Sequence, residues 1–242
     1  MYSFAPRSYR RLLITFRNAG YVFERFVNFR GSLQNSLLLR HDIDFSINIA
    51  LDLAKIDAEE KIQSTFFVQL RTPLYNALSK QNICILNQIN QLGHDIALHI
   101  ELDLYDDQRK GLSEELEILQ KYVPFSINNI ISVHRPRNLE SLQKMIFPAV
   151  KHTYEKLFFL DMAFFSDSRG EWRFGHPISS DAFMTRRSMQ LSLHPLWWIA
   201  RGHSPVQKLS YLTLSKSKEA LLGLEQAVSI PLDPIKLFLE KR

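Results

Sequence analysis

The sequence predicts an α/β fold, an irregular (β/α) barrel of six or seven parallel strands covered by helices. Short apolar runs alternate along the chain with stretches whose apolar residues recur at helical spacing. The apolar runs are nearly continuous, as strands are when a parallel sheet is buried on both faces. Six or seven such units within about 200 residues favour a barrel over an open sheet.

The elements follow from these two periods. Helices are expected over residues 6–19, 47–58, 74–92, 113–122 and 208–228. Cys84, in the apolar run ICIL, is expected to pack as a small apolar side chain. No repeat or Pro/Gly/Ser-rich linker interrupts the chain, so a single domain over residues 1–242 is expected. The expected strands are Leu37–Leu39, Ser64–Val68, Asp95–His99, Ile130–His134, Leu157–Leu160 and Met189–Leu193.

The composition restricts the class of protein and its partners. The formal net charge of +5 suits an anionic partner. The basic residues form no patch interleaved with aromatic residues, so a nucleic-acid partner is not expected. The single cysteine excludes an internal disulfide and agrees with a reducing compartment. Without a long apolar run or a secretory signal, we expect a cytoplasmic protein with no transmembrane segment.

Ionisable side chains stand at the carboxyl ends of four predicted strands. In a barrel of parallel strands these ends converge on one face, where active sites are built. Asp42 and Asp44 alternate in RHDID and share a strand face, and two close carboxylates are usually reconciled by a bound cation. The alternative is that Asp44 caps the helix that follows. The other residues at strand ends are His99, His134 and His194.

The run GHDIALH supplies a candidate metal ligand. His99 ends this strand, whereas His94 begins it on the opposite face and is expected to be structural. Neutral imidazole together with carboxylate is a common ligand set for Zn²⁺, and three protein ligands leave one position open for a reactive water. We therefore expect a divalent metal, with zinc as the first choice.

Taken together, RHDID, TFFV, GHDIALH, HRP and LSLH resemble the motifs of the polysaccharide deacetylase (NodB-homology) family, carbohydrate esterase family four. The resemblance covers about residues 37–198. It implies a NodB-like barrel and a metal-dependent hydrolase that removes an N-acyl group, acetyl or formyl, from a sugar. It also implies that Asp42 is the catalytic base, that Asp44 and His99 bind the metal, and that His194 is the general acid.

The third metal ligand is where the sequence departs from this family. Asp103 occupies the position of the family's second histidine. We expect His134 to supply the missing imidazole, with Glu101 and Asp103 as the alternatives. The family's Arg-x-Pro motif fits two registers, His134-Arg135-Pro136 and Arg135-Pro136-Arg137, and Arg135 is expected to contact the substrate. The closing Leu-x-His motif is matched loosely, because Ser192 stands where the first leucine belongs.

The segment SDSRGEWRFG is expected to add substrate contacts. By resemblance to the family's fourth motif, Asp167 and Trp172 belong to the site. A sugar ring stacks on an aromatic face, and Arg173 can bind a phosphate or carboxylate. The alternative is a polar loop with a packed tryptophan. RHDID, HRP and this segment look like a divergent branch associated with surface-polysaccharide biosynthesis, which implies an acylated sugar, nucleotide- or lipid-linked, as substrate.

A second function is compatible with the sequence. A chain that kept the barrel and lost catalysis would be a carbohydrate-binding or scaffold protein. The missing second histidine is the feature that supports this alternative. Metal analysis and a test for amine release separate the two.

Overall fold

The computed structural model describes residues 4–32, 34–147 and 149–228. This part of the chain falls into two compact units, with the division between Ile199 and Ala200. The first unit contains all the described strands and all the residues predicted to be functional, and the second contains helix α9 (Pro205–Val228). None of the described helices is both long and apolar enough to cross a membrane. A single domain over the whole chain stays a prediction.

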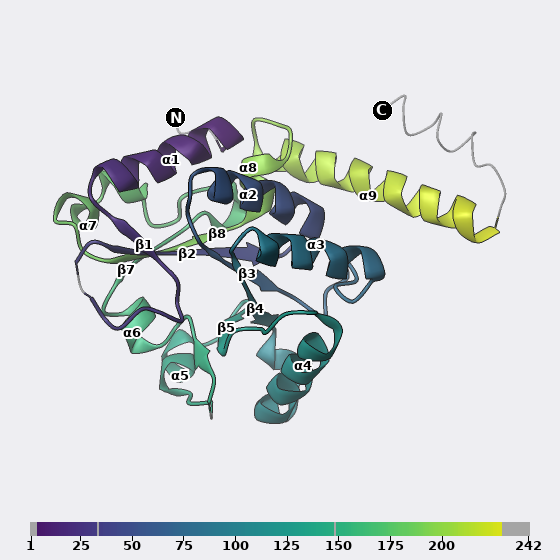
Figure 1. Ribbon diagram of the computed structural model, residues 1–242, viewed down its shortest axis with the longest axis horizontal. Coiled ribbons are helices and arrows are strands. Elements are labelled where there is room, and N and C mark those ends of the chain that lie inside the picture. The colour runs from purple at the N-terminus through teal and green to yellow at the C-terminus, as the bar shows by residue number, and fades with distance from the viewer. Residues whose placement is uncertain (1–3, 33, 148, 229–242) are drawn as a thin grey trace. The chain divides into compact units, whose positions relative to one another are not determined.

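Eight strands form one parallel sheet in the described residues. The main path is β6-β5-β4-β3-β2-β8-β7, and β1 pairs with the first half of β2 (Figure 1). No ladder among these residues joins β6 to β7, so the curled sheet is an open (β/α) barrel and the predicted fold class is confirmed. The strands are β1 (Val22–Glu24), β2 (Ser36–Ile43), β3 (Thr65–Val68), β4 (Asp95–Ile100), β5 (Ile130–Val133), β6 (Lys151–His152), β7 (Ala163–Ser166) and β8 (Met189–Leu193).

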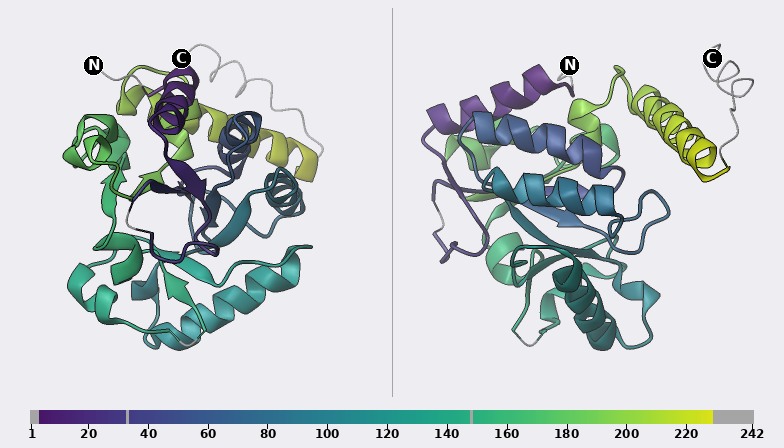
Figure 2. Two further views of the ribbon diagram at one scale, coloured as in Figure 1. Left: turned by 60° about the vertical axis from the view of Figure 1, so that its left-hand side comes forward. Right: turned by 45° about the vertical axis from the view of Figure 1, so that its right-hand side comes forward.

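The longer helices of the first unit lie outside the strands (Figure 2). Helix α2 begins at a side-chain cap, because Ser46 Oγ accepts a hydrogen bond from Ile49 N at 3.4 Å. The alternative that Asp44 caps this helix is therefore wrong. The helices are α1 (Pro6–Asn18), α2 (Ile47–Glu59), α3 (Lys80–Gln91), α4 (Gln108–Tyr122), α5 (Leu139–Lys144), α6 (Lys156–Phe159), α7 (Asp181–Met184) and α8 (Pro195–Ile199), with 3₁₀ turns η1 (Leu102–Leu104), η2 (Ser168–Gly170) and η3 (Pro177–Ser179).

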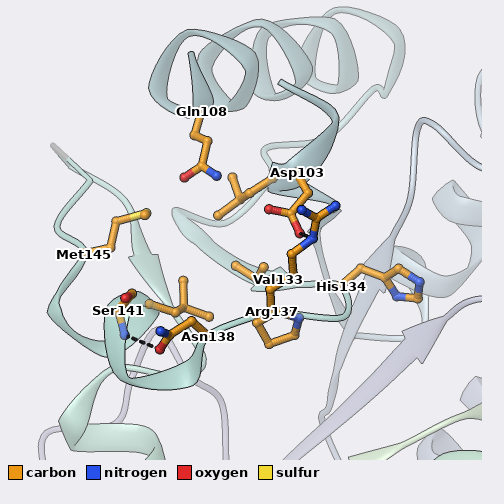
Figure 3. Close-up of a pocket in the computed structure, with 11 residues that line it drawn as sticks. Asp103, Gln108, Val133, His134, Arg137, Asn138, Ser141 and Met145 are labelled. Carbon is orange, nitrogen blue, oxygen red and sulfur yellow. Dashed lines mark hydrogen bonds and ion pairs between the residues drawn. The ribbon is translucent and has the colours of Figure 1, made fainter. Parts of the chain in front are cut away.

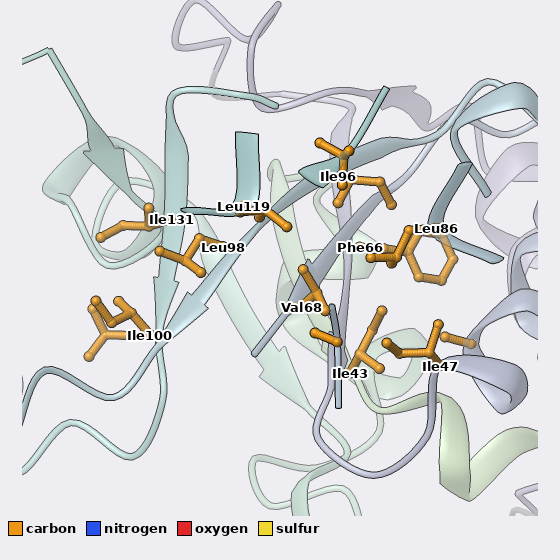
Figure 4. Close-up of a cluster of buried hydrophobic side chains, with 14 of the residues drawn as sticks. Ile43, Ile47, Phe66, Val68, Leu86, Ile96, Leu98, Ile100, Leu119 and Ile131 are labelled. Atoms are coloured by element: carbon orange, nitrogen blue, oxygen red, sulfur yellow. The ribbon is translucent and has the colours of Figure 1, made fainter. Parts of the chain in front are cut away.

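The outer face of the sheet and the helices share the larger hydrophobic core (Figure 4). Ile43, Phe66 and Ile96 come from three neighbouring strands, while Ile47 and Leu86 come from α2 and α3, and each is at most 2% exposed. Burying a side chain of this size contributes roughly 1.5–3 kcal/mol. This core therefore fixes the helices against the sheet and leaves the inner face free for other residues.

The inner face of the same strands changes character along their length. Residues two apart share a face, so each strand continues the same row of inward side chains towards its carboxyl end. Near the strand starts this row is apolar and forms a second core with Phe158. Further along, the inward side chains become polar or ionisable. The apolar members are Leu38, Phe67, Ala97 and Ile130, and the polar ones that follow them include Arg40, Asp42, His99 and Ser132.

Some local predictions are wrong. Residues 157–160, expected to form a strand, lie mostly in helix α6, and the strand is β7, a few residues later. Phe158 reaches the inner core from a helical turn, and a short apolar run cannot distinguish a buried helical turn from a strand. Cys84 is exposed on α3 rather than packed. The short strands β1 and β6 were not expected from the periodicity.

Candidate active site

The five ionisable residues predicted at strand ends gather on the inner face of the barrel. Asp42 lies in β2 and Asp44 directly follows it, His99 lies in β4, and His134 and His194 directly follow β5 and β8. In the sheet, β2 pairs with β8, and β4 pairs with β5. Their side chains approach one another to hydrogen-bonding or ion-pair distance.

Asp44, His99 and His134 form a compact group of potential metal ligands. Their donor atoms all lie within 4.8 Å of one another. His99 Nε2 is 3.2 Å from Asp44 Oδ1 and 3.2 Å from His134 Nδ1. His134 Nδ1 is 3.7 Å from the same Asp44 oxygen. One carboxylate oxygen and two ring nitrogens thus converge, each from a different strand end.

The surroundings of this group fit a divalent cation. His99 Nδ1 lies 3.1 Å from the backbone carbonyl of Ser132, which can only accept, so Nδ1 carries the proton and Nε2 faces the group. Asp44 Oδ1 is buried without a hydrogen-bond donor. An oxygen and two imidazole nitrogens suit Zn²⁺. The donor set therefore agrees with the metal expected from the sequence.

The electrostatics of the two histidines also suit a cation. Burial lowers the pKa of His99, but the nearby charges of Asp42 and Asp44 raise it by more, so the pKa lies above its ordinary value. These charges attract a positive species to the group, whether a proton or a metal ion. Burial and the neighbouring His99 lower the pKa of His134 to about 4. His134 is therefore a neutral imidazole near pH 7, the form that a metal ligand requires.

Asp42 lies beside this group and has one held and one unpaired oxygen. Its side chain is nearly inaccessible, and Oδ2 accepts hydrogen bonds from Arg40 Nη2 at 2.7 Å and Ser192 Oγ at 3.2 Å. Oδ1 is buried and has no hydrogen-bond partner among the described residues. Burial favours the neutral acid, but Arg40, His99 and His194 outweigh it and hold the pKa of Asp42 well below its usual range.

Arg40 belongs to the site, although the sequence motifs did not predict it. It is 1% exposed, and its Nη1 donates to Gln190 Oε1 at 3.2 Å and to Thr153 Oγ1. The signal was present in RHDID, because Arg40 stands two residues before Asp42 and therefore shares its face. Arginine is rarely buried without a partner. A carboxylate on the same strand face, that of Asp42, is the partner that allows Arg40 to be buried.

His194 faces the group from β8 and is held by Asp167. His194 Nδ1 is 2.7 Å from Asp167 Oδ1, and His194 Nε2 is 3.6 Å from Asp44 Oδ2. Asp167 is fully buried and also accepts a hydrogen bond from Trp198 Nε1 at 2.7 Å. Burial lowers the pKa of His194, but the hydrogen bond and charge of Asp167 overcome this and raise it to about 9. His194 is therefore an imidazolium near neutral pH.

The residues predicted to contact a substrate lie in different settings. Asp167 sits behind His194, which favours a supporting role over direct substrate contact. Arg135 and Arg173 are exposed, and Arg135 has a left-handed backbone with φ 44° directly after His134. Trp172 is half-buried, with its ring centroid 6.1 Å from that of Trp198.

Asp103 and Glu101, the alternative ligands, are not in the ligand group. The Asp103 carboxylate pairs with Arg137 Nε at 2.7 Å. Asp103 and Arg137 line a pocket beside His134, between the start of α4 and α5 (Figure 3). The ring of His134 points away from the Met145 side of this pocket (Figure 3). The pocket therefore lies next to the ligand group rather than containing it.

Comparisons with known proteins give a limited result. No family model matches the chain, and no curated protein does. Among solved structures it is similar to a family 4 carbohydrate esterase from Bacillus anthracis (TM-score 0.46, 14% identity, 86% of each chain). It is also similar to the Xyl-CE4 domain of a multidomain xylanase from the hindgut metagenome of Trinervitermes trinervoides (0.44, 12%, 81% of this chain and 91% of that one). The chain is also similar to a family 4 acetyl xylan esterase from Clostridium thermocellum, in complex with a cobalt ion. The TM-score is 0.37, the identity is 16%, and the match covers 81% of this chain and 92% of that one. Such low identities and TM-scores carry no argument about activity.

The ligand group leads to a prediction about metal content. Purified protein should hold about one divalent ion, and Asp44→Ala, His99→Ala and His134→Ala should each lose most of it, because each removes one of three donors. Asp103→Ala should keep it, because that carboxylate pairs with Arg137. Elemental analysis of the four variants measures this. Full occupancy in the first three, or loss in Asp103→Ala, would contradict the assignment.

The buried ion pair leads to a prediction about stability. Arg40→Met should lower the free energy of unfolding by about 3–5 kcal/mol, because it leaves Asp42 charged and buried without its cation. Adding Asp42→Asn to the same chain should recover part of the loss, since the uncompensated charge is then gone. Urea unfolding monitored by circular dichroism measures both. A single-variant loss below about 1 kcal/mol would be that of an ordinary substitution and would count against the pair.

Proposed function

We propose that the protein is a metal-dependent hydrolase that removes an N-acyl group, acetyl or formyl, from a sugar. The observation that carries the proposal is the opposite protonation of two groups beside the ligand group. Asp42 is ionised and presents an unpaired Oδ1, while His194 is an imidazolium whose Nε2 faces Asp44. A base and an acid that flank one reacting centre suit the hydrolysis of an amide.

The roles follow from what each group can give or take. Asp44, His99 and His134 would hold a divalent ion, which supplies a Lewis acid that polarises the amide carbonyl and makes water more acidic. Asp42 Oδ1 accepts a proton from the attacking water, because Oδ2 is already held by Arg40 and Ser192. His194 then donates its Nε2 proton to the sugar nitrogen. An amine leaves poorly until it is protonated, so this donor is essential.

Two further residues keep the acid and the base in these states. Arg40 keeps Asp42 ionised and oriented in a site that would otherwise favour the neutral acid. Asp167 keeps His194 protonated and fixes its ring through Nδ1, which leaves Nε2 for the leaving group. A base with a lowered pKa, Asp42, and an acid with a raised pKa, His194, form the pattern of general acid–base catalysis.

The finer parts of the proposal rest on the sequence motifs. We place the chain in the polysaccharide deacetylase family, on a divergent branch of surface-polysaccharide biosynthesis, with zinc as the metal. The substrate is an acylated sugar, nucleotide- or lipid-linked, and the protein acts in the cytoplasm. Arg135, Trp172 and Arg173 are proposed to contact it, with the two exposed arginines suited to a phosphate or carboxylate on the substrate.

The direct test is amine release. Protein loaded with Zn²⁺ is incubated with N-acetylated and N-formylated nucleotide sugars, and free amine is measured. Release that depends on the metal supports the proposal. A metal-loaded protein that binds these sugars without releasing amine would instead be a carbohydrate-binding protein on the same fold.

The acid and base are predicted to be separable from metal binding. Asp42→Asn and His194→Ala should each keep the metal, because neither belongs to the ligand group. Each should lose on the order of 10²-fold or more in kcat, because one removes the proton acceptor and the other the proton donor. Parallel metal analysis is the control. Near-normal turnover in either variant would remove that residue from the mechanism.

Asp167→Asn tests how His194 is kept protonated. The amide fills the same space but carries no charge to stabilise an imidazolium, so kcat should fall by about 10-fold or more while the metal is retained. Steady-state kinetics and elemental analysis measure the two effects. An unchanged kcat would mean that the contact at 2.7 Å has no part in the reaction.

A further inference from the structure

A group of aromatic rings lies behind the Asp167–His194 pair and belongs partly to α1. The centre of this group is Trp198 on α8, which is 3% exposed. The rings of Phe4 and Tyr9 have centroids 4.8 Å and 5.3 Å from that of Trp198. Phe4 and Tyr9 lie outside the stretch that carries the sequence motifs, so the motifs gave no reason to connect α1 with the site.

Trp198 connects these rings to the proposed acid by one hydrogen bond. Its Nε1 donates to Asp167 Oδ2 at 2.7 Å, while Asp167 Oδ1 lies 2.7 Å from His194 Nδ1. Among the described residues, the other donor to this carboxylate is the backbone N–H of His194, at 3.0 and 3.2 Å. Trp198 is therefore the only side chain besides His194 that fixes the rotation of the Asp167 carboxylate, as far as the described residues show.

The position of Trp198 is itself fixed from α1. Tyr9 is fully buried, and its hydroxyl donates to Asp57 Oδ1. Asp57 Oδ2 is bound by Ser64 Oγ at 2.7 Å and lies 2.8 Å from His41 Nε2. These contacts hold the Tyr9 ring in one place against the indole. The indole is packed between fixed neighbours and has little freedom to let its N–H move away from Asp167.

We propose that Trp198 is a positioning residue for His194, held in place by α1 and acting through Asp167. This inference rests on the proposed function, in which His194 Nε2 must reach the leaving nitrogen. A displacement of about 1 Å in a reacting group is enough to cost a large factor in rate. Trp198 holds Oδ2 of the carboxylate that orients His194, and so fixes the rotation at which Oδ1 meets the imidazole.

The neighbouring Trp197 offers a matched control. It is also 3% exposed, and its ring packs on Phe45 with centroids 5.6 Å apart. Its Nε1 is buried without a hydrogen-bond partner among the described atoms. Tryptophan→Phe at either position removes the same atoms from an equally buried site. Only Trp198→Phe also removes a hydrogen bond to Asp167.

The test is a double-mutant cycle in kcat, with KM, metal content and melting temperature measured for every variant. Trp198→Phe should lower kcat by about 10-fold, the size expected for a lost hydrogen bond to a charged group, with KM and metal content unchanged. Trp197→Phe should stay within about 2-fold of the wild type in kcat. In the Asp167→Ala background, Trp198→Phe should cost almost nothing further, because the coupling runs through the missing carboxylate.

Two outcomes would overturn the inference while the proposed function stands. One is a wild type that releases amine and a Trp198→Phe variant that behaves like Trp197→Phe. The other is an effect of Trp198→Phe that persists in full in the Asp167→Ala background, which is what a general loss of packing would give. A wild type that releases no amine from any acylated sugar tested overturns the proposed function itself, and with it any role of Trp198 in that reaction.

A readout without substrate checks the physical contact. The indole N–H proton of Trp198 bonds to a carboxylate, so its NMR signal should shift strongly in Asp167→Ala. The corresponding signal of Trp197, which has no such partner, should barely move. Equal shifts of the two signals would count against the link between Trp198 and Asp167.

Discussion

The buried ion pair between Arg40 and Asp42 is the interaction that the rest of the barrel interior has to accommodate. The two residues are 1% and 3% exposed, and a buried charge without a partner costs several kcal/mol. The remaining guanidinium donors therefore need fixed acceptors. Gln190 provides one, and its own amide N–H groups are bound to the carbonyls of Thr153 and Phe158 at 3.1 and 2.7 Å. The acceptor oxygen of Gln190 thus has a fixed orientation.

The pair also explains the inward row of β8. Gln190, Ser192 and His194 are two residues apart and share a face, and β8 is paired with β2. The first holds Arg40, the second donates to Asp42, and the third faces Asp44. Ser192 occupies the position where the related motif carries leucine. Its hydroxyl donates a hydrogen bond to the carboxylate of Asp42 on the neighbouring strand β2.

Much of this could be predicted from the sequence, because it depends on strand periodicity. The period of two placed Asp42 and Asp44 on one face, and the parallel alternation placed His99, His134 and His194 at the same end of the barrel. The periodicity could not show which side chain would neutralise Asp42, since that depends on the contact between Arg40 and β8. It also could not show the support of His194 from α1, because Tyr9 and Trp198 are brought together only by packing of the helices.

The polar clusters on the two faces of β2 differ in how their carboxylates are paired. On the outer face, both carboxylate oxygens of Asp57 have hydrogen-bond partners, in Tyr9, His41 and Ser64. On the inner face, Asp42 and Asp44 each keep one buried oxygen without a hydrogen-bond donor among the described residues. Buried polar atoms are nearly always paired, so unpaired ones call for an explanation. A cation at Asp44 and a reacting water at Asp42 would supply the missing partners.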